Sequence, residues 1–283
     1  MRNSEMNSTV ILPNGRDAPS LGLGTWHMGE RIGDPAAEAL ALKRGLDLGA
    51  TLIDTAEMYA RGGAERVVAE AIKGRREEVF IVSKVLPHNA SRHGTIKACE
   101  NSLQRLGIES IDLYLLHWPG RHPLRDTVEA FHELKNTGKI KAWGVSNFDT
   151  SDMEELWSVP GGADCQTNQI LYNLMRRGVE WDLLPWCEKK GVSVMAYSPL
   201  EQGRLLGNEK LRLIAEQLNL SVAQIAIAWT LRKKGVISIP KASSIKHVEE
   251  NIAAWSIELE KKDCDMLDDE FKPPLKKEML GIL

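Results

Sequence analysis

The sequence predicts an α/β fold of the TIM-barrel type, a (β/α)8 barrel in which eight parallel strands alternate with helices. Short runs rich in Val, Ile and Leu recur along the chain and are separated by amphipathic stretches. Polar side chains follow several of these runs where each run ends. Strands that alternate with single helices imply right-handed βαβ units and a parallel sheet, and eight such units close into a barrel.

Eight runs qualify as strands, because a strand that is buried on both faces reads as near-continuous apolar sequence. They are residues 21–26, 51–55, 79–85, 111–118, 140–147, 165–170, 192–198 and 236–242. Residues 10–20 precede the first strand and carry turn residues, so we expect a hairpin that closes the barrel floor.

Helices are indicated where apolar residues return every three or four positions and a glycine follows the last turn. The clearest examples are residues 36–49, 64–74, 94–107 and 222–235. Each of these stretches lies between two predicted strands, as a barrel requires.

The composition excludes some classes of protein. The chain has 283 residues, 43% of them hydrophobic, which is enough to bury a large core, and we expect one domain over residues 1–283. Its 36 basic and 39 acidic residues are mixed along the chain and leave a net charge of -3. No basic cluster would follow a phosphate backbone, so we expect no nucleic-acid partner.

The start, MRNSEMNSTV, is polar, and no apolar run approaches the roughly 20 residues that span a bilayer. We therefore expect a cytoplasmic protein with no membrane partner. Cys99, Cys165, Cys187 and Cys264 are scattered, with no CxxC pair and no histidine at ligand spacing. They are interpreted as reduced thiols and not as a disulfide framework or a zinc site.

Four polar residues, Asp54, Tyr59, Lys84 and His117, occur where apolar runs end. Any one of them alone is compatible with an ordinary structural role, such as a helix cap or a satisfied core histidine. Barrel enzymes assemble their chemistry from residues at the carboxyl ends of several strands, so the four together predict one proton-transfer site.

A metal-dependent hydrolase or lyase on the same fold is an alternative that would also place Asp and His at strand ends. It would need three or four convergent ligands. The other strand ends carry weak metal ligands, namely Thr25, Lys84, Asn147, Gln169, Tyr197 and Lys241. The sequence therefore predicts no metal site.

Short motifs occur in order at the predicted strand ends. They are GLGTW at 22–26, DTAEMY at 54–59, SK at 83–84, LHW at 116–118, GVSNF at 144–148, TNQILYN at 167–173, YSPL at 197–200, IPK at 239–241 and EEN at 249–251. These motifs resemble those of the aldo-keto reductase family over nearly the whole chain. The resemblance implies carbonyl reduction with a nicotinamide cofactor. GGAE at 62–65, VPGG at 159–162 and DLLPWC at 182–187 are most similar to bacterial members that reduce methylglyoxal and other small aldehydes.

The four residues suit this chemistry. Hydride addition to a carbonyl carbon leaves a developing alkoxide, which needs a proton donor and local positive potential. Tyr59 is the expected donor, and we expect the Lys84 ammonium to lower the phenol's pKa from its usual value of about 10. Asp54 would hold Lys84, and His117 would orient the substrate oxygen.

The remaining strand ends suit a nicotinamide dinucleotide. No GxGxxG follows a strand, so a doubly wound dinucleotide-binding domain is not supported. Ser146, Asn147 and Gln169 offer donors and acceptors to the carboxamide, and Tyr197 offers a flat ring for stacking. Further expected cofactor contacts are Gly24, Thr25, Trp26, Asp54, Ser198, Leu200 and Gln202.

The adenosine end is predicted to lie after the eighth strand. Lys241, Ser243 and Ser244 precede a predicted helix, where backbone donors and the helix dipole favour an anion such as the 2′-phosphate of NADPH. By resemblance, Glu250 and Asn251 contact adenine.

The chain departs from the family pattern at this end. The family often has Ser directly after the lysine and Arg six residues after it, where this chain has Ala242 and His247. His247 remains an expected cofactor contact, and Lys246 is a second candidate cation. NADPH is the expected cofactor, and the use of NADH stays open because a charge-assisted hydrogen bond has been lost.

Trp26, His88 and Trp118 flank the catalytic positions and are the expected substrate-binding residues. Together they would line an aromatic, partly polar pocket suited to a small aldehyde. Residues 268–283 either fold over the mouth or fray, and both alternatives stand.

These observations predict a monomer that uses NADPH to reduce a small-molecule carbonyl substrate, a methylglyoxal-like aldehyde or dicarbonyl, to the alcohol. The alternative is a redox sensor or auxiliary subunit of the same fold that holds the cofactor with little turnover. The presence of all four predicted catalytic residues favours the enzyme.

Overall fold

A closed parallel barrel forms the centre of the molecule. The computed structural model describes residues 9–283, and in this range eight parallel strands are ordered β10-β9-β8-β7-β6-β5-β4-β3. The strands are β3 (Gly22–Gly24), β4 (Leu52–Asp54), β5 (Phe80–Val85), β6 (Leu113–Leu116), β7 (Trp143–Ser146), β8 (Thr167–Leu171), β9 (Ser193–Tyr197) and β10 (Val236–Ile239). Parallel bridges from Leu21 to Ser238 and from Gly24 to Lys241 join the two edges. The predicted (β/α)8 barrel is confirmed.

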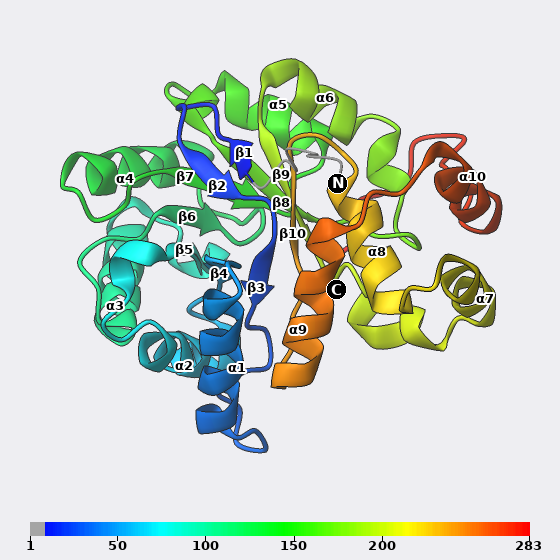
Figure 1. The fold of residues 1–283 in the computed structure, drawn as a ribbon. Coiled ribbons are helices and arrows are strands. Elements are labelled where there is room, and N and C mark those ends of the chain that lie inside the picture. Colours follow the sequence, from blue (N-terminus) through cyan, green and yellow to red (C-terminus); the bar gives the residue numbers. More distant parts are fainter. Residues whose placement is uncertain (1–8) are drawn as a thin grey trace.

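Helices surround the sheet (Figure 1). They are α1 (Pro35–Asp47), α2 (Gly63–Ala71), α3 (Arg92–Leu106), α4 (Leu124–Asn136), α5 (Thr150–Ser158), α6 (Leu183–Lys190), α7 (Glu209–Leu218), α8 (Val222–Leu231), α9 (Ile245–Ala253) and α10 (Lys261–Glu270). Short 3-10 turns are η1 (Tyr59–Gly62), η2 (Arg76–Glu78), η3 (Pro87–Asn89), η4 (Gly162–Asp164), η5 (Gly178–Glu180), η6 (Glu201–Gly207) and η7 (Ala254–Ser256). In the described range, no helix has the length and apolar character needed to cross a membrane.

One connection differs from the expected alternation with single helices. Both α7 and α8 lie between β9 and β10. Most residues of α8 are buried, including Ile225, Ile227 and Trp229, so this helix packs in the interior, whereas few residues of α7 are buried. A helix that is apolar on most of its surface needs cover on more than one side, and α7 supplies part of that cover.

Local signals account for several helix ends. Asp34 accepts hydrogen bonds from the first amides of α1, and Pro35 occupies the first helical position. Capping boxes built on Asp149 and Ser221 begin α5 and α8. Gly107 ends α3 in the left-handed conformation, with φ of 67°, which glycine adopts without steric cost.

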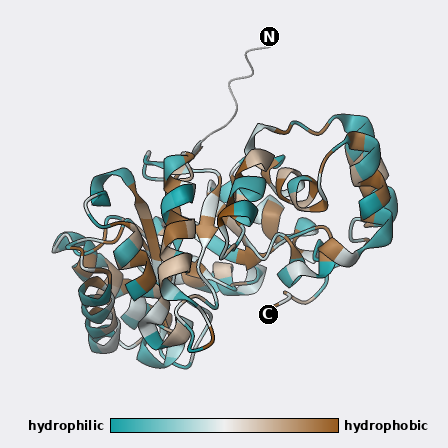
Figure 2. Ribbon diagram, turned by 60° about the horizontal axis from the view of Figure 1, so that its bottom comes forward, coloured by the Kyte–Doolittle hydropathy of each residue, from teal (hydrophilic) through white to brown (hydrophobic). Residues whose placement is uncertain are grey.

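Two apolar layers stabilise the barrel. Phe80 and Val82 of β5 point into the barrel, whereas Ile81 between them points outward and packs beneath the helices. This alternation follows from the two-residue period of a strand. Figure 2 shows the hydrophobic strands enclosed by helices whose outer faces are hydrophilic.

A hairpin closes the barrel floor, as the sequence predicted. Strands β1 (Thr9–Ile11) and β2 (Asp17–Pro19) pair antiparallel, and Val10, Leu12 and Ala18 pack against the inward-facing apolar residues of the barrel. The hairpin therefore covers apolar side chains that would otherwise face water at the amino-terminal end of the strands.

A buried carboxylate ties this hairpin to the barrel. Asp112, whose side chain is 4% exposed, forms ion pairs with Arg16, Arg76 and Lys141, and it accepts the Ile81 amide at 2.9 Å. Burial alone would raise the pKa of Asp112, but the Ile81 hydrogen bond and the cations outweigh it, so the pKa is lowered.

We expect Asp112→Asn to lower the free energy of unfolding at neutral pH by about 2 kcal/mol, because three cations lose their shared anion while remaining partly exposed. In the wild type this contribution is present above the unfolded-state pKa of about 4 and is lost as the pH falls through the lower folded-state value. Urea unfolding at neutral and acidic pH measures both effects. Exposed Asp17 in the same hairpin provides the matched control, Asp17→Asn, and equal losses in the two variants would contradict the expectation.

Candidate active site

A cavity of about 980 Å³ opens at the carboxyl ends of the strands. Its lining brings together most of the residues predicted from the sequence: Gly24, Thr25, Trp26, Asp54, Tyr59, His117, Trp118, Ser146, Asn147, Gln169, Tyr197, Ser198, Leu200, Gln202, Lys241, His247, Glu250 and Asn251. Lys84 lies beneath the lining and is fully buried. The parallel strands place these side chains together because their carboxyl ends meet at one rim.

The ammonium of Lys84 is the centre of the cluster. Its Nζ donates to Asp54 Oδ2 at 2.7 Å, to the Thr55 carbonyl at 2.8 Å and to Tyr59 Oη at 3.3 Å. An ammonium has three N–H donors, so each donor finds an acceptor. Nζ also lies 4.9 Å from the centre of the Tyr59 ring. This arrangement fixes the phenol oxygen relative to the charge.

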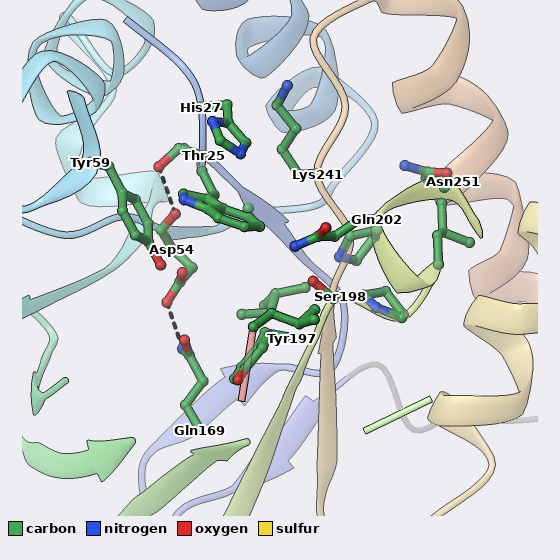
Figure 3. A pocket seen from close by; sticks show the side chains of 18 of the residues that line it. Thr25, His27, Asp54, Tyr59, Gln169, Tyr197, Ser198, Gln202, Lys241 and Asn251 are labelled. Atoms are coloured by element: carbon green, nitrogen blue, oxygen red, sulfur yellow. Dashed lines mark hydrogen bonds between the residues drawn. The ribbon is translucent and has the colours of Figure 1, made fainter. Parts of the chain in front are cut away.

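Asp54 is held from two further directions. Gln169 Nε2 donates to Asp54 Oδ1 at 2.7 Å, and Thr25 Oγ1 donates to the Asp54 carbonyl at 2.9 Å. Figure 3 shows both contacts, with Asp54 between Gln169 and Thr25. Gln169 was predicted from sequence as a carboxamide contact, and its bond to Asp54 was not expected. It comes from β8, which is separated from β4 by three strands in the sheet, so no local sequence signal indicates it.

The protonation of Tyr59 differs from the sequence expectation. Burial, and then the negative charge of Asp54, raise the pKa of the phenol well above its usual value. The expected lowering by Lys84 is therefore wrong for this state of the protein. The physical reason is that Asp54 lies against the same ammonium and offsets its field, so desolvation of the phenolate dominates. Burial also lowers the pKa of Lys84, against the effect of Asp54.

His117 is a neutral imidazole. Burial and the Lys84 charge lower its pKa to about 2, and its ring lies edge-on to Tyr59, with 5.7 Å between ring centres. Its Nδ1 is buried without a hydrogen-bond partner in the protein. An unpaired buried N–H is rarer than an unpaired acceptor, so the proton is assigned to Nε2.

The turn that carries Tyr59 is tightly wound. Ala60, Arg61 and Gly62 all have positive φ, at 48°, 52° and 81°. A Cβ at Gly62 would lie 2.4 Å from the side chain of Arg105 on α3, so only glycine fits there without a shift of the arginine. Glu57, just before this turn, accepts from the Leu86 amide at 2.8 Å and thereby joins the loops after β4 and β5.

A second hydrogen-bonded group lies across the cavity floor. Tyr197 Oη donates to Asn147 Oδ1 at 2.8 Å, and Asn147 Nδ2 donates to the His117 carbonyl at 3.1 Å and to Ser146 Oγ at 3.1 Å. Asn147 has a φ of 57°, a left-handed conformation that Asn tolerates better than most residues. This conformation turns the residue after β7 into the cavity.

The loop after β9 forms one wall and also contains left-handed backbone at Ser198, Glu201 and Gln202. Glu201 has a fully buried side chain that pairs with Arg176 and Arg204. Strain of this kind persists only where surrounding contacts over-determine the conformation, and it gathers at functional sites.

The far end of the cavity is more open. Lys241 and His247 line it, and both are exposed. Figure 3 shows Lys241 well away from Tyr59 and on the same side as His27. Ser243 and Ser244 are exposed and do not line the cavity, and Ser244 instead caps α9 by accepting from the His247 amide at 3.3 Å.

One predicted substrate residue lies elsewhere. His88 is exposed in η3 and is not part of the cavity lining. The 3-10 turn begins at Pro87, two residues after the end of β5. Adjacency to a catalytic residue in sequence was the signal for His88, and it does not determine the direction of the following loop.

The sequence analysis also missed part of the lining. His27, Leu206, Ile282 and Leu283 contribute to it. His27 directly follows the GLGTW motif, which is a signal that could have indicated it. Of the two alternatives for residues 268–283, the structure has the folded one, because Ile282 and Leu283 reach the cavity.

Within the described range, no group of three or more His, Cys, Asp or Glu side chains is arranged to hold a metal ion. What the cluster can do follows from its groups: a protonated phenol, a buried ammonium and a neutral imidazole converge on one wall of the cavity. Together they can bind an oxygen atom and give it a proton.

Comparisons with known proteins agree with this arrangement. A sequence model of the aldo/keto reductase family matches residues 20–270. Methylglyoxal reductase YeaE of Escherichia coli is 51% identical over 270 residues, which cover 94% of this chain and 95% of that protein. Glyoxal reductase of Bacillus subtilis is 37% identical over 265 residues, covering 94% of this chain and 93% of that protein.

Solved structures of aldo-keto reductases are also similar to this protein. An aldo/keto reductase from Klebsiella pneumoniae, crystallised with NADP and acetate, has a TM-score of 0.95 at 48% identity and covers 98% of this chain and 99% of its own. A structure of an aldo-keto reductase from the same organism in complex with NADPH has a TM-score of 0.94 with the same identity and coverage. From the near-complete family match, the likeness of these structures and the cluster at the barrel mouth, it follows that this protein is an oxidoreductase of the aldo/keto reductase family.

Proposed function

We propose that this protein reduces small aldehydes and dicarbonyls, of which methylglyoxal is the reference compound, to alcohols with NADPH. The observation that carries the proposal is the contact of Lys84 Nζ with both Tyr59 Oη and Asp54 Oδ2 below an open cavity. The proposal is also supported by the similarity of the chain to two relatives, a methylglyoxal reductase and a glyoxal reductase.

In the proposed reaction Tyr59 is the general acid. Its raised pKa keeps the phenol protonated at neutral pH, which is the form that reduction requires. As negative charge develops on the substrate oxygen, the phenol proton moves to that oxygen. Lys84, 3.3 Å from Tyr59 Oη, then stabilises the phenolate that remains. Asp54 keeps the ammonium in place.

His117 positions the substrate. With its proton on Nε2, the neutral ring donates a hydrogen bond to the carbonyl oxygen and does not compete with Tyr59 as an acid, because its pKa is lowered to about 2. Trp26 and Trp118 line the same part of the cavity, and we assign them to the substrate side. A small aldehyde needs little more than this oxygen site and apolar walls.

The cavity residues fit a nicotinamide dinucleotide. When bound, the cofactor supplies the hydride. Gln169, Ser146 and Asn147 are buried polar side chains at the floor, and they would hold the carboxamide. Tyr197 offers its ring to the nicotinamide. The wall formed by Ser198, Leu200 and Gln202 would follow the diphosphate, with Gly24 and Thr25 opposite.

The exposed end of the cavity, which Lys241 and His247 line, would hold the adenosine. Lys241 would meet the 2′-phosphate of NADPH, with His247, Glu250 and Asn251 around the adenosine. Ser243 and Ser244 support this end indirectly, since Ser244 begins α9. The exposed lysine favours NADPH over NADH, and NADH remains the competing cofactor.

We further propose that residues 1–283 act as one domain, in a cytoplasmic monomer. The support for one domain is that a single barrel with its helices accounts for residues 9–283, and the support for the cytoplasm is that Cys99, Cys165, Cys187 and Cys264 are free thiols. Size-exclusion chromatography with light scattering tests the monomer. A redox sensor with little turnover is the competing function, and the complete cluster disfavours it.

The function is tested by following NADPH oxidation with methylglyoxal, other small aldehydes and a ketone, in parallel with NADH. We expect turnover with NADPH and aldehydes. Saturable NADPH binding without turnover on any carbonyl compound would instead support the sensor.

We predict that Tyr59→Phe lowers kcat at least about a hundredfold, because general-acid catalysis contributes this much or more. The affinity for NADPH should stay within a few fold, since the phenol does not hold the dinucleotide. Stopped-flow turnover and fluorescence titration measure the two quantities. A variant that kept a tenth of the wild-type kcat would show that Tyr59 is not the acid.

We predict that Lys84→Met is at least as damaging to kcat, because the developing phenolate loses its cation. Asp54 would also be left buried without its partner, so the free energy of unfolding should fall by about 3 kcal/mol. Steady-state kinetics and urea unfolding check these outcomes. Near-normal activity at neutral pH would contradict the role of Lys84.

We predict that Lys241→Met raises the Kd for NADPH at least about tenfold, equivalent to about 1.4 kcal/mol, and leaves the Kd for NADH nearly unchanged. His247→Arg should tighten NADPH binding and steepen its salt dependence, because a second fixed cation would meet the phosphate. Parallel titrations of both cofactors at several salt concentrations test this. Equal NADPH and NADH affinities in the wild type, unmoved by Lys241→Met, would mean that this end does not recognise the phosphate.

A further inference from the structure

A buried carboxylate lies outside the cavity, behind the strand that carries Lys84. Glu65 on α2 is fully buried; its Oε1 accepts from Ser83 Oγ at 2.7 Å, and its Oε2 accepts from Arg105 Nε at 2.5 Å. Ser83 and Lys84 are neighbours on β5, so their side chains point to opposite sides of the barrel wall. One acid therefore joins α2, β5 and α3.

This group also contacts the turn that carries Tyr59. Glu65 lies in the first turn of α2, which begins directly after η1. Arg105, its partner from α3, fills the space beside Gly62, where a Cβ would lie 2.4 Å from the arginine side chain. The Glu65 cluster, defined as Glu65, Ser83 and Arg105, thus connects the Tyr59 turn to the strand of Lys84.

The charge of Glu65 acts on Lys84 through the barrel wall. Burial lowers the pKa of Lys84, and Asp54 and then Glu65 act in the opposite direction. Charges interact over longer distances in the poorly polarisable interior than in water. Glu65 therefore adds to Asp54 in favouring the ammonium form of Lys84.

Apart from Asp54, the other ionisable groups around Glu65 and Lys84 carry no negative charge that would also favour the Lys84 ammonium. On the outer side, Cys99 of α3 and Tyr114 of β6 face Glu65, and burial raises the pKa of both, so they stay neutral. Arg105 is the cation on that side; because it is partly exposed whereas Glu65 is fully buried, it offsets only part of the Glu65 charge.

On the cavity side, Lys84 faces Asp54 of β4, Tyr59 of η1 and His117 after β6. The phenol and the imidazole are neutral at pH 7. Asp54 and Glu65 are therefore the two carboxylates whose charges favour the ammonium.

We propose that Glu65 is a positioning residue of this enzyme, which keeps Lys84 in its ammonium form and anchors the Tyr59 turn against β5. The inference rests on the proposed carbonyl reduction. It adds a requirement on the outer side of the barrel wall, at a residue that does not line the cavity.

The test compares Glu65→Gln with Glu70→Gln, which makes the same change of charge at an exposed position of α2. The pH profile of kcat/KM for NADPH-dependent methylglyoxal reduction reports the free-enzyme groups. In Glu65→Gln, Lys84 should lose its proton more readily, so the alkaline limb should move to lower pH by about half a unit or more. Glu70→Gln should leave the limb in place, and Ser83→Ala, which keeps the carboxylate, should move it less than Glu65→Gln does.

A direct measurement on the cofactor-free protein complements the kinetics. The carbon-13 resonance of the Lys84 Cε, assigned by its absence in Lys84→Met, should titrate at lower pH in Glu65→Gln than in the wild type. If Glu65→Gln does not fold because Arg105 loses its partner, Arg105→Gln tests the same electrostatic effect with the opposite sign. It keeps the carboxylate and removes the cation that offsets it, so the Lys84 resonance should titrate at higher pH than in the wild type.

An unchanged limb and an unchanged Lys84 titration in a folded variant of Glu65 or of Arg105 would overturn the inference. If the wild type itself showed no turnover of any carbonyl compound, the proposed function would fail instead. In that case the resonance titration would still decide whether Glu65 sets the charge of Lys84.

Discussion

The burial of the Lys84 ammonium constrains the rest of the site, because the surrounding groups must compensate its charge and accept its hydrogen bonds. Lys84 is fully enclosed, and an enclosed charge is tolerated only if it is paired and its hydrogen bonds are satisfied. Asp54 supplies the opposite charge, while the Thr55 carbonyl and Tyr59 Oη accept the other two N–H groups. The phenol is thus one of the acceptors that make the buried lysine possible. The geometry needed for proton transfer is also the geometry that stabilises the charge.

This constraint extends to residues that never meet a substrate. Asp54 is held by Gln169 from the far side of the barrel, and Glu65 lies behind the strand that carries Lys84. Removing one partner would leave a charge uncompensated in a poorly polarisable interior. The proposed active site is therefore a set of mutually dependent groups spread over several strands and the first helices, with left-handed turns at its rim.

The two ends of the cavity differ in how deeply their charged groups are buried. At the end that contains Lys84 and Tyr59, burial makes each interaction strong and leaves little freedom, and His117 is held neutral there. At the far end, Lys241 and His247 are exposed, so single charges act through screened interactions. If the proposed roles hold, cofactor preference is consequently open to change by few substitutions, whereas the reaction chemistry is not. Ile282 and Leu283 belong to a third region, the cover of the mouth, which comes from the end of the described chain.

The sequence by itself determined the barrel, the hairpin at its floor and the four residues Asp54, Tyr59, Lys84 and His117, because apolar runs and the polar residues that end them are local patterns. Parallel strands then bring those ends together whatever the details of the loops. Only the tertiary structure decided which way the loops turn, so that His88 and the two serines before α9 lie outside the cavity while Ile282 reaches it. It also decided that burial and Asp54 raise the pKa of Tyr59. A pKa depends on the burial of the group and on the charges around it, and these come from side chains that are distant in sequence. A local sequence pattern therefore cannot predict the direction of the shift.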